Sequence, residues 1–387
     1  MANRIGLDIG STAVRAVELT GGDPPSVIRA VQVPLPAGAV DNGEVRDPAT
    51  VGEALKDLWQ SGGFKGRNRK VWLGVGNQRL VVREIALPFL PEKELRASLG
   101  FQVQEFIPMP VEDAVLDFDA LDEFEADGRR MLRILLVAAQ RGMVDMVVQA
   151  ALAAKLEPVG LDLVPFALVR AVGSSDAGMD LEGQGDEAII DVGAHVTNIV
   201  VHARGRTRFV RILPSGGRDV TLAIARTLGV DTEIAERLKR GEDVGEIATT
   251  APAQPEQGTP PIGPSGGPAP AEPAGGAEAA HGASTRERVR QVAMQRAGSF
   301  VDEIRSSLEF YTAQAQGARI DRVLVCGGGS KLDGFIELLG QRIPVPVEPG
   351  RLFQHVGHQL PLSDEALAEA ERVLPVAVGL AIPGRSL

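Results

Sequence analysis

The sequence predicts an α/β protein built from two similar lobes, and two observations carry this prediction. Segments with the apolar period of a helix alternate with strand-like apolar runs along all 387 residues, which is typical of α/β folds. The tetrapeptide Leu7-Asp8-Ile9-Gly10 recurs 183 residues later as Ile190-Asp191-Val192-Gly193, with the same apolar-Asp-apolar-Gly order. Because each copy ends one predicted strand and precedes another, we expect an internal duplication.

The elements expected along the chain follow from local apolar patterns and from turn residues. In chain order they are a strand pair over 5–19, a helix near 51–60, a strand at 71–75, a helix near 92–106, a strand pair around 115–137, a helix over 144–154, a strand pair over 187–201, a helix over 286–316, a strand at 322–326, a helix from about 332 and a final helix near 375–382.

The stretch 248–284 differs in composition from the rest of the chain. Pro, Gly and Ala supply 25 of its 37 residues, and it contains no Lys or Arg. Such a stretch buries too little apolar surface to offset an ordering cost of about 1–2 kcal/mol per residue. We therefore expect a disordered loop here.

Charge and cysteine content exclude several classes of protein. A net charge of −11 argues against non-specific nucleic-acid binding, but not against a phosphate ligand held by backbone N–H groups. Cys326 is the sole cysteine, so a disulfide framework and a thiolate metal site are both excluded. Neither a signal peptide nor an apolar run long enough to span a bilayer is visible, and a cytoplasmic protein is expected.

Two glycine turns, each at the end of a predicted strand, have the chemistry of phosphate sites. Gly10 and Gly193 allow backbone amides to approach a phosphate closely. The hydroxyls of Ser11 and Thr12 in the first turn, and of Thr197 in the second, can donate to phosphate oxygens. Turns from two lobes can hold a triphosphate from opposite sides, so a nucleotide site is predicted.

Metal and nucleoside positions are expected beside these turns. Asp8 and Asp191 would hold Mg²⁺, through water, because this ion keeps much of its hydration shell. A third turn, Gly327-Gly328-Gly329-Ser330, ends a strand and leads into a predicted helix. Its flat backbone suits the ribose or the α-phosphate of a nucleotide.

Each of these features has a simpler interpretation when taken alone. A glycine-rich turn more often reverses the chain, and Asp at a strand end more often caps a turn. No G-x-x-x-x-G-K-[ST] loop is present, and Arg79 stands at the third glycine position after Gly74-Val75-Gly76, which disfavours a Rossmann site. The order and spacing of the three turns together favour a nucleotide site.

The sequence around the three turns resembles that of a known superfamily. LDIGSTAVRAVEL, IIDVGAHVTNIVV and VLVCGGGSKLDGF are similar to the two phosphate motifs and the adenosine motif of actin-like ATPases. QEFIPMPVEDAVLDF, LLVAAQRGMVDMVVQA, GLDLVPFALVRAV and EIRSSLEFY resemble, more narrowly, the PilM family of type IV pilus assembly proteins. The resemblance covers nearly the whole chain outside the Pro/Gly/Ala stretch.

The resemblance implies an actin-like two-lobed fold, with duplicated RNase H-like lobes and an inserted α+β subdomain in the first lobe. The implied boundaries are 1–81 and 157–185 for the first lobe, 82–156 for the inserted subdomain, 186–230 and 318–387 for the second lobe, and 231–317, with the loop 248–284, for an insertion in the second lobe.

The resemblance also implies ATP and Mg²⁺ as ligands and extends the set of site residues. By motif position, Arg15 joins the first phosphate element, where family members commonly carry Lys. Gly216-Gly217 precede a helix and could add backbone donors. Glu236 and Lys239, at i,i+3 on a predicted helix, match a spacing that contacts adenosine; the alternative is a surface ion pair.

The implied function is a nucleotide-dependent scaffold that binds the cytoplasmic tail of PilN and communicates with the pilus motor ATPases. Self-association is possible within such a family, and contact with the membrane would be indirect, through the partner. Catalytic residues are not identified, because 161–172 contains Asp162 as its only acid and no Gln to orient water. Phe101, Phe106 and Met109 are candidates for the partner groove, with core burial as the alternative.

Two other functions remain open at this point. A small-molecule kinase of the same superfamily would need an acidic general base, for which no candidate is evident. A filament-forming ATPase resembling FtsA would usually carry an amphipathic membrane helix, and the last residues, 381–387, do not have that pattern.

Overall fold

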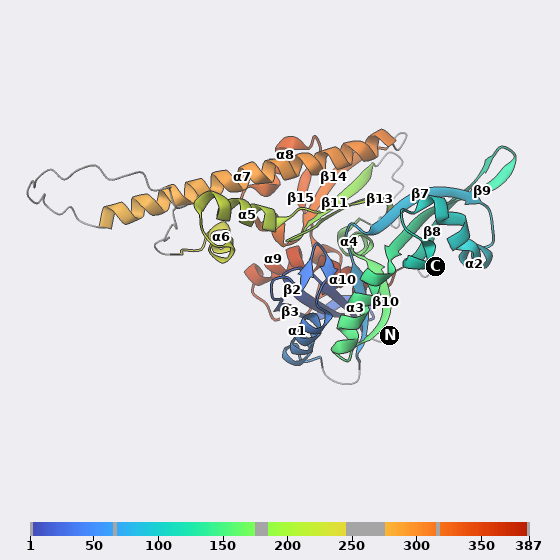
Figure 1. Ribbon diagram of the computed structural model, residues 1–387, viewed down its shortest axis with the longest axis horizontal. Coiled ribbons are helices and arrows are strands. Elements are labelled where there is room, and N and C mark those ends of the chain that lie inside the picture. The colour runs from blue at the N-terminus through green and yellow to red at the C-terminus, as the bar shows by residue number, and fades with distance from the viewer. Residues whose placement is uncertain (1–2, 65–67, 175–184, 245–274, 315–317, 385–387) are drawn as a thin grey trace, which may run out of the picture. The chain divides into compact units, whose positions relative to one another are not determined.

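The computed structural model describes residues 3–64, 68–174, 185–244, 275–314 and 318–384, and only the backbone for 275–284. Residues 248–274 of the predicted loop lie outside the described residues. The chain divides into two units, Met1–Gly217 with Val301–Leu387, and Arg218–Phe300. The larger unit contains all the sheets of the described chain (Figure 1).

Six strands form the first sheet of the larger unit. They are β1 (Arg4–Ile9), β2 (Ala13–Leu19), β3 (Ser26–Pro34), β6 (Lys70–Val75), β10 (Glu157–Leu163) and β16 (Gly357–His358). The sheet order is β10-β6-β1-β2-β3-β16. β1, β2 and β3 are antiparallel neighbours, whereas β6 and β10 add in parallel on the other side of β1.

Five strands form the second sheet with the same topology. They are β11 (Asp186–Val192), β12 (Thr197–Ala203), β13 (Arg206–Leu213), β14 (Ile320–Cys326) and β15 (Val347–Pro349). The order is β13-β12-β11-β14-β15, with three antiparallel strands followed by two parallel ones. In both sheets the first strand of the set lies at the centre. The predicted duplication is therefore confirmed.

Helices cover the first sheet on both faces. α1 (Pro48–Ser61) and α3 (Arg141–Ala153) share one apolar cluster with one face of that sheet. α4 (Val164–Val172) and α10 (Pro375–Ala381) share another cluster that includes side chains from both large sheets. α4 and α10 thus form the apolar layer that joins the two halves of the larger unit.

Local sequence explains where α1 begins. Asp47 is its N-cap, and the carboxylate accepts hydrogen bonds from the backbone N–H groups of Ala49 and Thr50 at 3.0 and 3.1 Å. Pro48 occupies the first turn, where its missing N–H costs nothing. The buried stripe Val51, Leu55 and Leu58 then faces the sheet.

A third, three-stranded sheet interrupts the chain between β6 and β10. It consists of β7 (Leu80–Pro88), β8 (Ala114–Ala126) and β9 (Arg129–Gln140), all antiparallel, with β9 in the centre. α2 (Glu92–Val103) packs on it and shares its apolar cluster. We call β7, β8, β9 and α2 the inserted sheet. The predicted domain boundaries around it stay predictions.

A two-stranded hairpin lies earlier in the chain. It consists of β4 (Val40–Asp41) and β5 (Glu44–Val45), joined by Asn42-Gly43. Both turn residues have positive φ, 50° and 74°. An Asn-Gly pair is the preferred sequence for this backbone, so the hairpin is encoded locally.

The smaller unit contains α5 (Gly217–Leu228), α6 (Thr232–Lys239) and part of α7 (Gly275–Gln314). The buried residues of α5 include Val220 and Ile224. α7 starts eleven residues before the predicted start at 286, so residues 275–284 are helical rather than part of a loop. The Gly- and Ala-rich composition there misled the prediction, because Ala is also the best helix former.

The end of the larger unit departs from the prediction in one detail. A helix was expected from about residue 332, directly after the third glycine turn. Instead a short 3₁₀ helix spans Gly328–Lys331, and α8 (Phe335–Arg342) starts after Gly334, whose φ is +78°. α9 (Asp364–Val373) follows before α10. The N-terminus of α8 is therefore displaced from the glycines.

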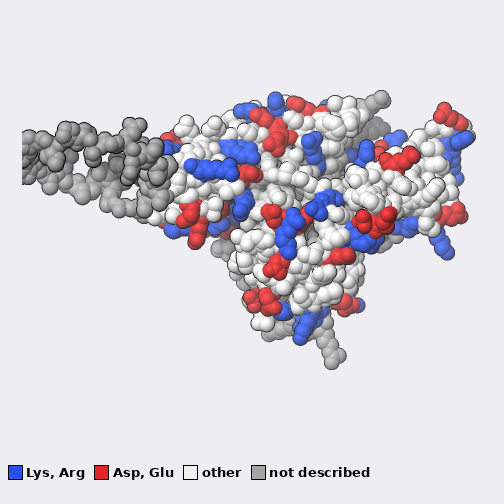
Figure 2. Space-filling model, in the orientation of Figure 1, with Lys and Arg blue, Asp and Glu red and all other residues white. Residues whose placement is uncertain are grey.

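Charges of both signs are interspersed over the face drawn in Figure 2. Within the described ranges, every helix is too short or too polar to cross a lipid bilayer.

Candidate functional site

The first two glycine turns have the same hydrogen bond. The Gly10 N–H donates to the Ala13 carbonyl at 3.0 Å, and the Gly193 N–H donates to the Val196 carbonyl at 2.9 Å. Each bond closes a tight turn between the first two strands of its sheet. The turns are therefore structural equivalents, as the repeated tetrapeptide predicts.

In the first sheet the turn is flanked by an ion pair. Asp8 lies opposite Arg15 across β1 and β2, and its Oδ2 is 3.1 Å from Arg15 Nη1. Arg15 Nε also donates to Gln32 Oε1 at 2.8 Å, which fixes the guanidinium beside the turn. Ser11 is half-buried and Thr12 is exposed at the tip of the turn. Burial raises the pKa of Asp8, and the charge of Arg15 opposes that rise.

In the second sheet the equivalent carboxylate has an amide partner. Asp191 lies opposite Asn198, and Asn198 Nδ2 donates to Asp191 Oδ2 at 3.2 Å. Burial, and after it the nearby negative charge of Asp8, raises the pKa of Asp191 to about 6. The two predicted metal-binding carboxylates therefore lie within electrostatic reach of each other, and Arg15 is the cation beside them.

The turn at Gly216-Gly217 packs directly on the second phosphate turn. The Gly217 N–H donates to the Gly193 carbonyl at 2.9 Å. A Cβ on Gly216 would approach the Gly193 and Ala194 carbonyls to less than 3 Å, so only glycine fits. The structure thus brings Gly216 and Gly217 to the second turn, where the Gly217 N–H is used to hold the two turns together.

The third turn also packs on the second. Gly327 has φ +88°, and a Cβ there would meet the Val192 carbonyl and the carboxylate of Asp191. A Cβ on Gly329 would lie 2.5 Å from Val192 Cγ1 and 3.2 Å from the Gly193 carbonyl oxygen. Gly328, by contrast, is exposed, and a Cβ there would have no neighbour within 4 Å. Gly328 therefore faces open space beside Asp191.

Two hydroxyls from the predicted set face inward rather than toward a ligand. Thr197 is fully buried, and its Oγ1 donates to the Ser215 carbonyl at 2.9 Å. Ser330 is buried too, and its Oγ donates to the Gly327 carbonyl at 2.7 Å. The expectation that Thr197 donates to phosphate is wrong for this structure, because its hydroxyl holds two turns together.

The structure adds residues that the sequence analysis missed. Among the described residues, Asn198 Oδ1 and Ser215 Oγ are buried without a hydrogen-bond partner. Buried polar atoms of this kind are rare and mark places where a ligand or water supplies the missing bond. Asn198 could have been found by alignment of the two hairpins, because it follows Asp191 by the same seven positions that separate Arg15 from Asp8.

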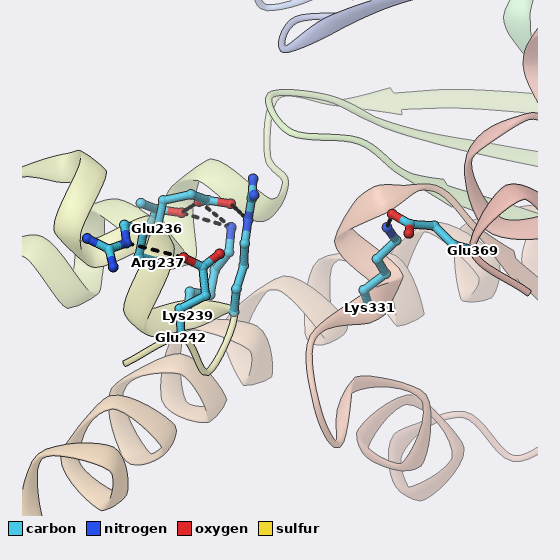
Figure 3. A network of polar contacts seen from close by, with 8 residues as sticks. Glu236, Arg237, Lys239, Glu242, Lys331 and Glu369 are labelled. Atoms are coloured by element: carbon cyan, nitrogen blue, oxygen red, sulfur yellow. Dashed lines mark hydrogen bonds and ion pairs between the residues drawn. The ribbon is translucent and has the colours of Figure 1, made fainter. Parts of the chain in front are cut away.

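Glu236 and Lys239 belong to the smaller unit and form a network on α6 (Figure 3). Lys239 Nζ lies 2.7 Å from Glu236 Oε2 and 2.9 Å from Thr221 Oγ1. The Thr221 hydroxyl donates to the same carboxylate oxygen at 2.5 Å, and Arg240 contacts the other oxygen at 3.1 Å. The i,i+3 pair therefore forms, and a residue of α5 extends it.

The donor set fits a hydrated cation better than a directly bound one. In the described parts of the chain, no group of three or more His, Cys, Asp or Glu side chains could hold a metal. Asp8 and Asp191 are two carboxylates beside one guanidinium, so they carry excess negative charge in a partly buried place. A cation that keeps its water shell and touches few protein oxygens matches this arrangement.

Known proteins are similar to this chain in sequence and in architecture. The sequence profile of the family described as type IV pilus assembly protein PilM matches residues 6–255, and that of cell division protein FtsA matches residues 188–371. Among solved structures, the PilM-PilN type IV pilus biogenesis complex has 27% identity and a TM-score of 0.76, over 98% of each chain.

Two further solved structures share the fold at low identity. The ethanolamine utilization protein EutJ from Carboxydothermus hydrogenoformans has 15% identity and a TM-score of 0.54, over 99% of this chain and 90% of that one. A nucleotide-free diol dehydratase-reactivating factor has 10% identity and a TM-score of 0.50, over 98% and 99%. The fold is actin-like, with two RNase H-like lobes, as predicted.

Proposed function

Because the chain belongs to the family of type IV pilus assembly protein PilM, we propose that it is an ATP-binding scaffold of the inner-membrane platform of the type IV pilus. It binds the cytoplasmic tail of PilN and is held at the inner membrane through that partner. One observation supports nucleotide binding most strongly. Two equivalent glycine turns from two sheets bring Asp8 and Asp191 within electrostatic reach, beside the exposed backbone of Gly328.

The backbone of the glycine turns provides the phosphate donors in this proposal. The Gly10 and Gly193 N–H groups already donate inside their own turns, so these glycines would shape the turns while the neighbouring turn amides face phosphate oxygens, and Gly216-Gly217 would extend the second turn. Ser11 and Thr12 add hydroxyls, and Arg15 adds a positive charge already oriented by Asp8 and Gln32.

The remaining residues serve the metal and the nucleoside. ATP supplies a polyanion whose charge Mg²⁺ partly neutralises, and Asp8 and Asp191 would bind that ion through water. Gly327, Gly328 and Gly329 would receive the nucleoside end, with Thr197 and Ser330 holding the turns in shape. The adenosine contacts of Glu236 and Lys239, in the smaller unit, stay a prediction from the resemblance.

Binding rather than turnover is the proposed role of the nucleotide. Asp162, the one acid in the segment 161–172, forms an ion pair with Arg170, and its other oxygen accepts the Leu163 N–H at 2.7 Å. Both oxygens are engaged, so this carboxylate is not placed to act as a general base. A small-molecule kinase is disfavoured on the same ground.

The inserted sheet is the proposed partner surface. Phe101 on α2 is 87% exposed, which excludes core burial for this side chain. Phe106 and Met109 pack against the apolar cluster of the inserted sheet instead. An exposed phenylalanine in a chain with few aromatics is a typical anchor for a partner peptide. Links to the motor ATPases and self-association stay predictions.

Capture on an immobilised peptide of the cognate PilN tail, with and without Mg-ATP, tests the scaffold role. Titration with a fluorescent ATP analogue, with and without Mg²⁺, tests the ligand. We expect specific capture and magnesium-dependent binding. If the peptide retains the protein neither with nor without Mg-ATP, the proposed PilN interaction is refuted. If the ATP analogue shows no saturable binding, the proposed nucleotide ligand is refuted.

A further inference from the structure

The β4–β5 hairpin contacts the second phosphate turn from the first half of the larger unit. His195, which follows Gly193 and Ala194, is buried, and its Nδ1 lies 3.1 Å from Asp41 Oδ1. The Asn42 N–H points at the same nitrogen from 3.4 Å. One tautomer donates from Nδ1 to the carboxylate, and the other accepts from the amide. The hairpin can thus meet the turn in two ways.

The same hairpin is anchored to the loop between β6 and β7. A Cβ on Gly43 would strike the Gly76 carbonyl, so the two backbones touch closely. Asn77 is fully buried; its Nδ2 donates to the Gly43 carbonyl at 3.4 Å, and its Oδ1 accepts the Arg79 N–H at 2.8 Å. The hairpin and residues 76–79 are therefore in direct contact.

Arg79 joins the hairpin to both strands at the base of the inserted sheet. Its Nε lies 2.6 Å from Glu44 Oε1 on β5, and its Nη1 donates to Gln140 Oε1 at 2.7 Å. Arg79 directly precedes β7, and Gln140 is the last residue of β9. The guanidinium thus contacts the hairpin and the two strand ends at once.

A second, shorter route runs beside the first. A Cβ on Gly76 would lie 3.3 Å from Asn198 Oδ1 and 2.9 Å from Val164 Cβ. Asn198 donates to Asp191, one of the proposed metal-binding carboxylates. The loop that leads from β6 into the inserted sheet therefore touches the second phosphate hairpin directly, as well as through the β4–β5 hairpin.

We propose that the β4–β5 hairpin and the 76–79 loop couple nucleotide binding at the second phosphate turn to peptide binding by the inserted sheet. This inference rests on the proposed function and specifies its regulation. Nucleotide at the turn constrains His195, which alters its contact with Asp41, and Arg79 passes the change to β7 and β9. Since coupling is reciprocal, the peptide changes nucleotide affinity by the same factor.

The test is a thermodynamic cycle on the full chain. The Kd of Mg-ATP is measured alone and with saturating PilN tail peptide, and the ratio is the coupling factor, expected to be about 5-fold or more. In Asp41→Ala and in Arg79→Gln, we expect the factor to fall toward one, while each ligand alone binds within about 3-fold of the wild-type Kd. Thermal melts show which variants are folded.

Lys56→Gln is the matched control, because it removes a comparable ion pair with Glu53 (2.7 Å) on α1, away from the relay. It should leave the coupling factor unchanged. If the wild type binds both ligands but its coupling factor is one, the coupling is refuted and the proposed function stands. Retention of the wild-type factor in both Asp41→Ala and Arg79→Gln also overturns the coupling. Absence of binding of either ligand overturns the proposed function and, with it, this inference.

Discussion

The carboxylate of Asp191 lies close enough to that of Asp8 for the charge of Asp8 to raise the pKa of Asp191, although 183 residues separate them in the chain. The pairing arises because each carboxylate ends the central strand of its own sheet. Two acids held in this way destabilise each other unless a proton or a cation intervenes. Several measurable consequences follow from this and from the packing around it.

Stability should depend on the protonation of Asp191. Its folded-state pKa of about 6 exceeds the ordinary value of 3.8, so the folded state binds more protons between these values. The free energy of unfolding therefore falls as pH rises through about 6. In magnesium-free buffer, Asp191→Asn should melt above the wild type at pH 8, with a smaller difference at pH 4.5. Parallel melting curves across this range would contradict the assignment.

A side chain at Gly328 should block the nucleotide without disturbing the fold. A Cβ there meets nothing within 4 Å, so Gly328→Leu should leave the melting temperature nearly unchanged. It should weaken binding of the ATP analogue by about 10-fold or more, equal to about 1.4 kcal/mol. Gly340→Leu, at an equally open glycine on α8, is the control and should bind normally. Equal affinity in both variants would place the nucleotide elsewhere.

The contact between α4 and α10 should tolerate no added atoms. A Cβ on Gly379 would overlap the backbone of Ala167, and backbone cannot move aside cheaply. Gly379→Ala should lower the free energy of unfolding by at least about 1–3 kcal/mol. Gly142→Ala, on α3 with open space around it, should stabilise by about 0.4–1 kcal/mol. Denaturant melts of the two variants distinguish them, and an unchanged Gly379→Ala would refute the packing.

Phe101 should matter for the partner and not for the fold. Since its side chain is 87% exposed, Phe101→Ser should change stability by less than about 0.5 kcal/mol. It should weaken capture of the PilN tail peptide by about 5-fold or more, as expected for an interface anchor. Leu152→Ser, an exposed apolar residue on α3, serves as the control. If both variants bind the peptide like wild type, the partner surface lies elsewhere.

Local sequence predicts the turns well and their surroundings poorly. The Asp-apolar-Gly repeat could be recognised in the sequence because both strands end in the same way, in a tight chain reversal beside a carboxylate. Gln32 was not predictable as a partner of Arg15, because the contact depends on the register between β2 and β3. The inward hydroxyl of Thr197 depends on Ser215, which follows the end of the third strand of that sheet, β13.

The predicted starts of α7 and α8 differ from the observed ones. Residues 275–284 share Gly and Ala with the stretch before them, yet they continue α7, whose regular apolar stripe lies further along. Conversely, Gly334 at φ +78° delays α8 beyond the start expected from the apolar pattern. In the first place the high helix propensity of Ala outweighs a composition typical of loops, and in the second a single glycine in the left-handed region delays the helix.

The burial of Gly6 beneath α10 has a consequence for synthesis in the cell. Gly6 packs against Ala377 and Leu380, some 371 residues further along the chain. The face of β1 that α10 covers therefore stays exposed on the nascent chain until α10 itself has been translated. During that interval the nascent protein is open to aggregation and to chaperone capture, and truncated translation products would stay in that state permanently.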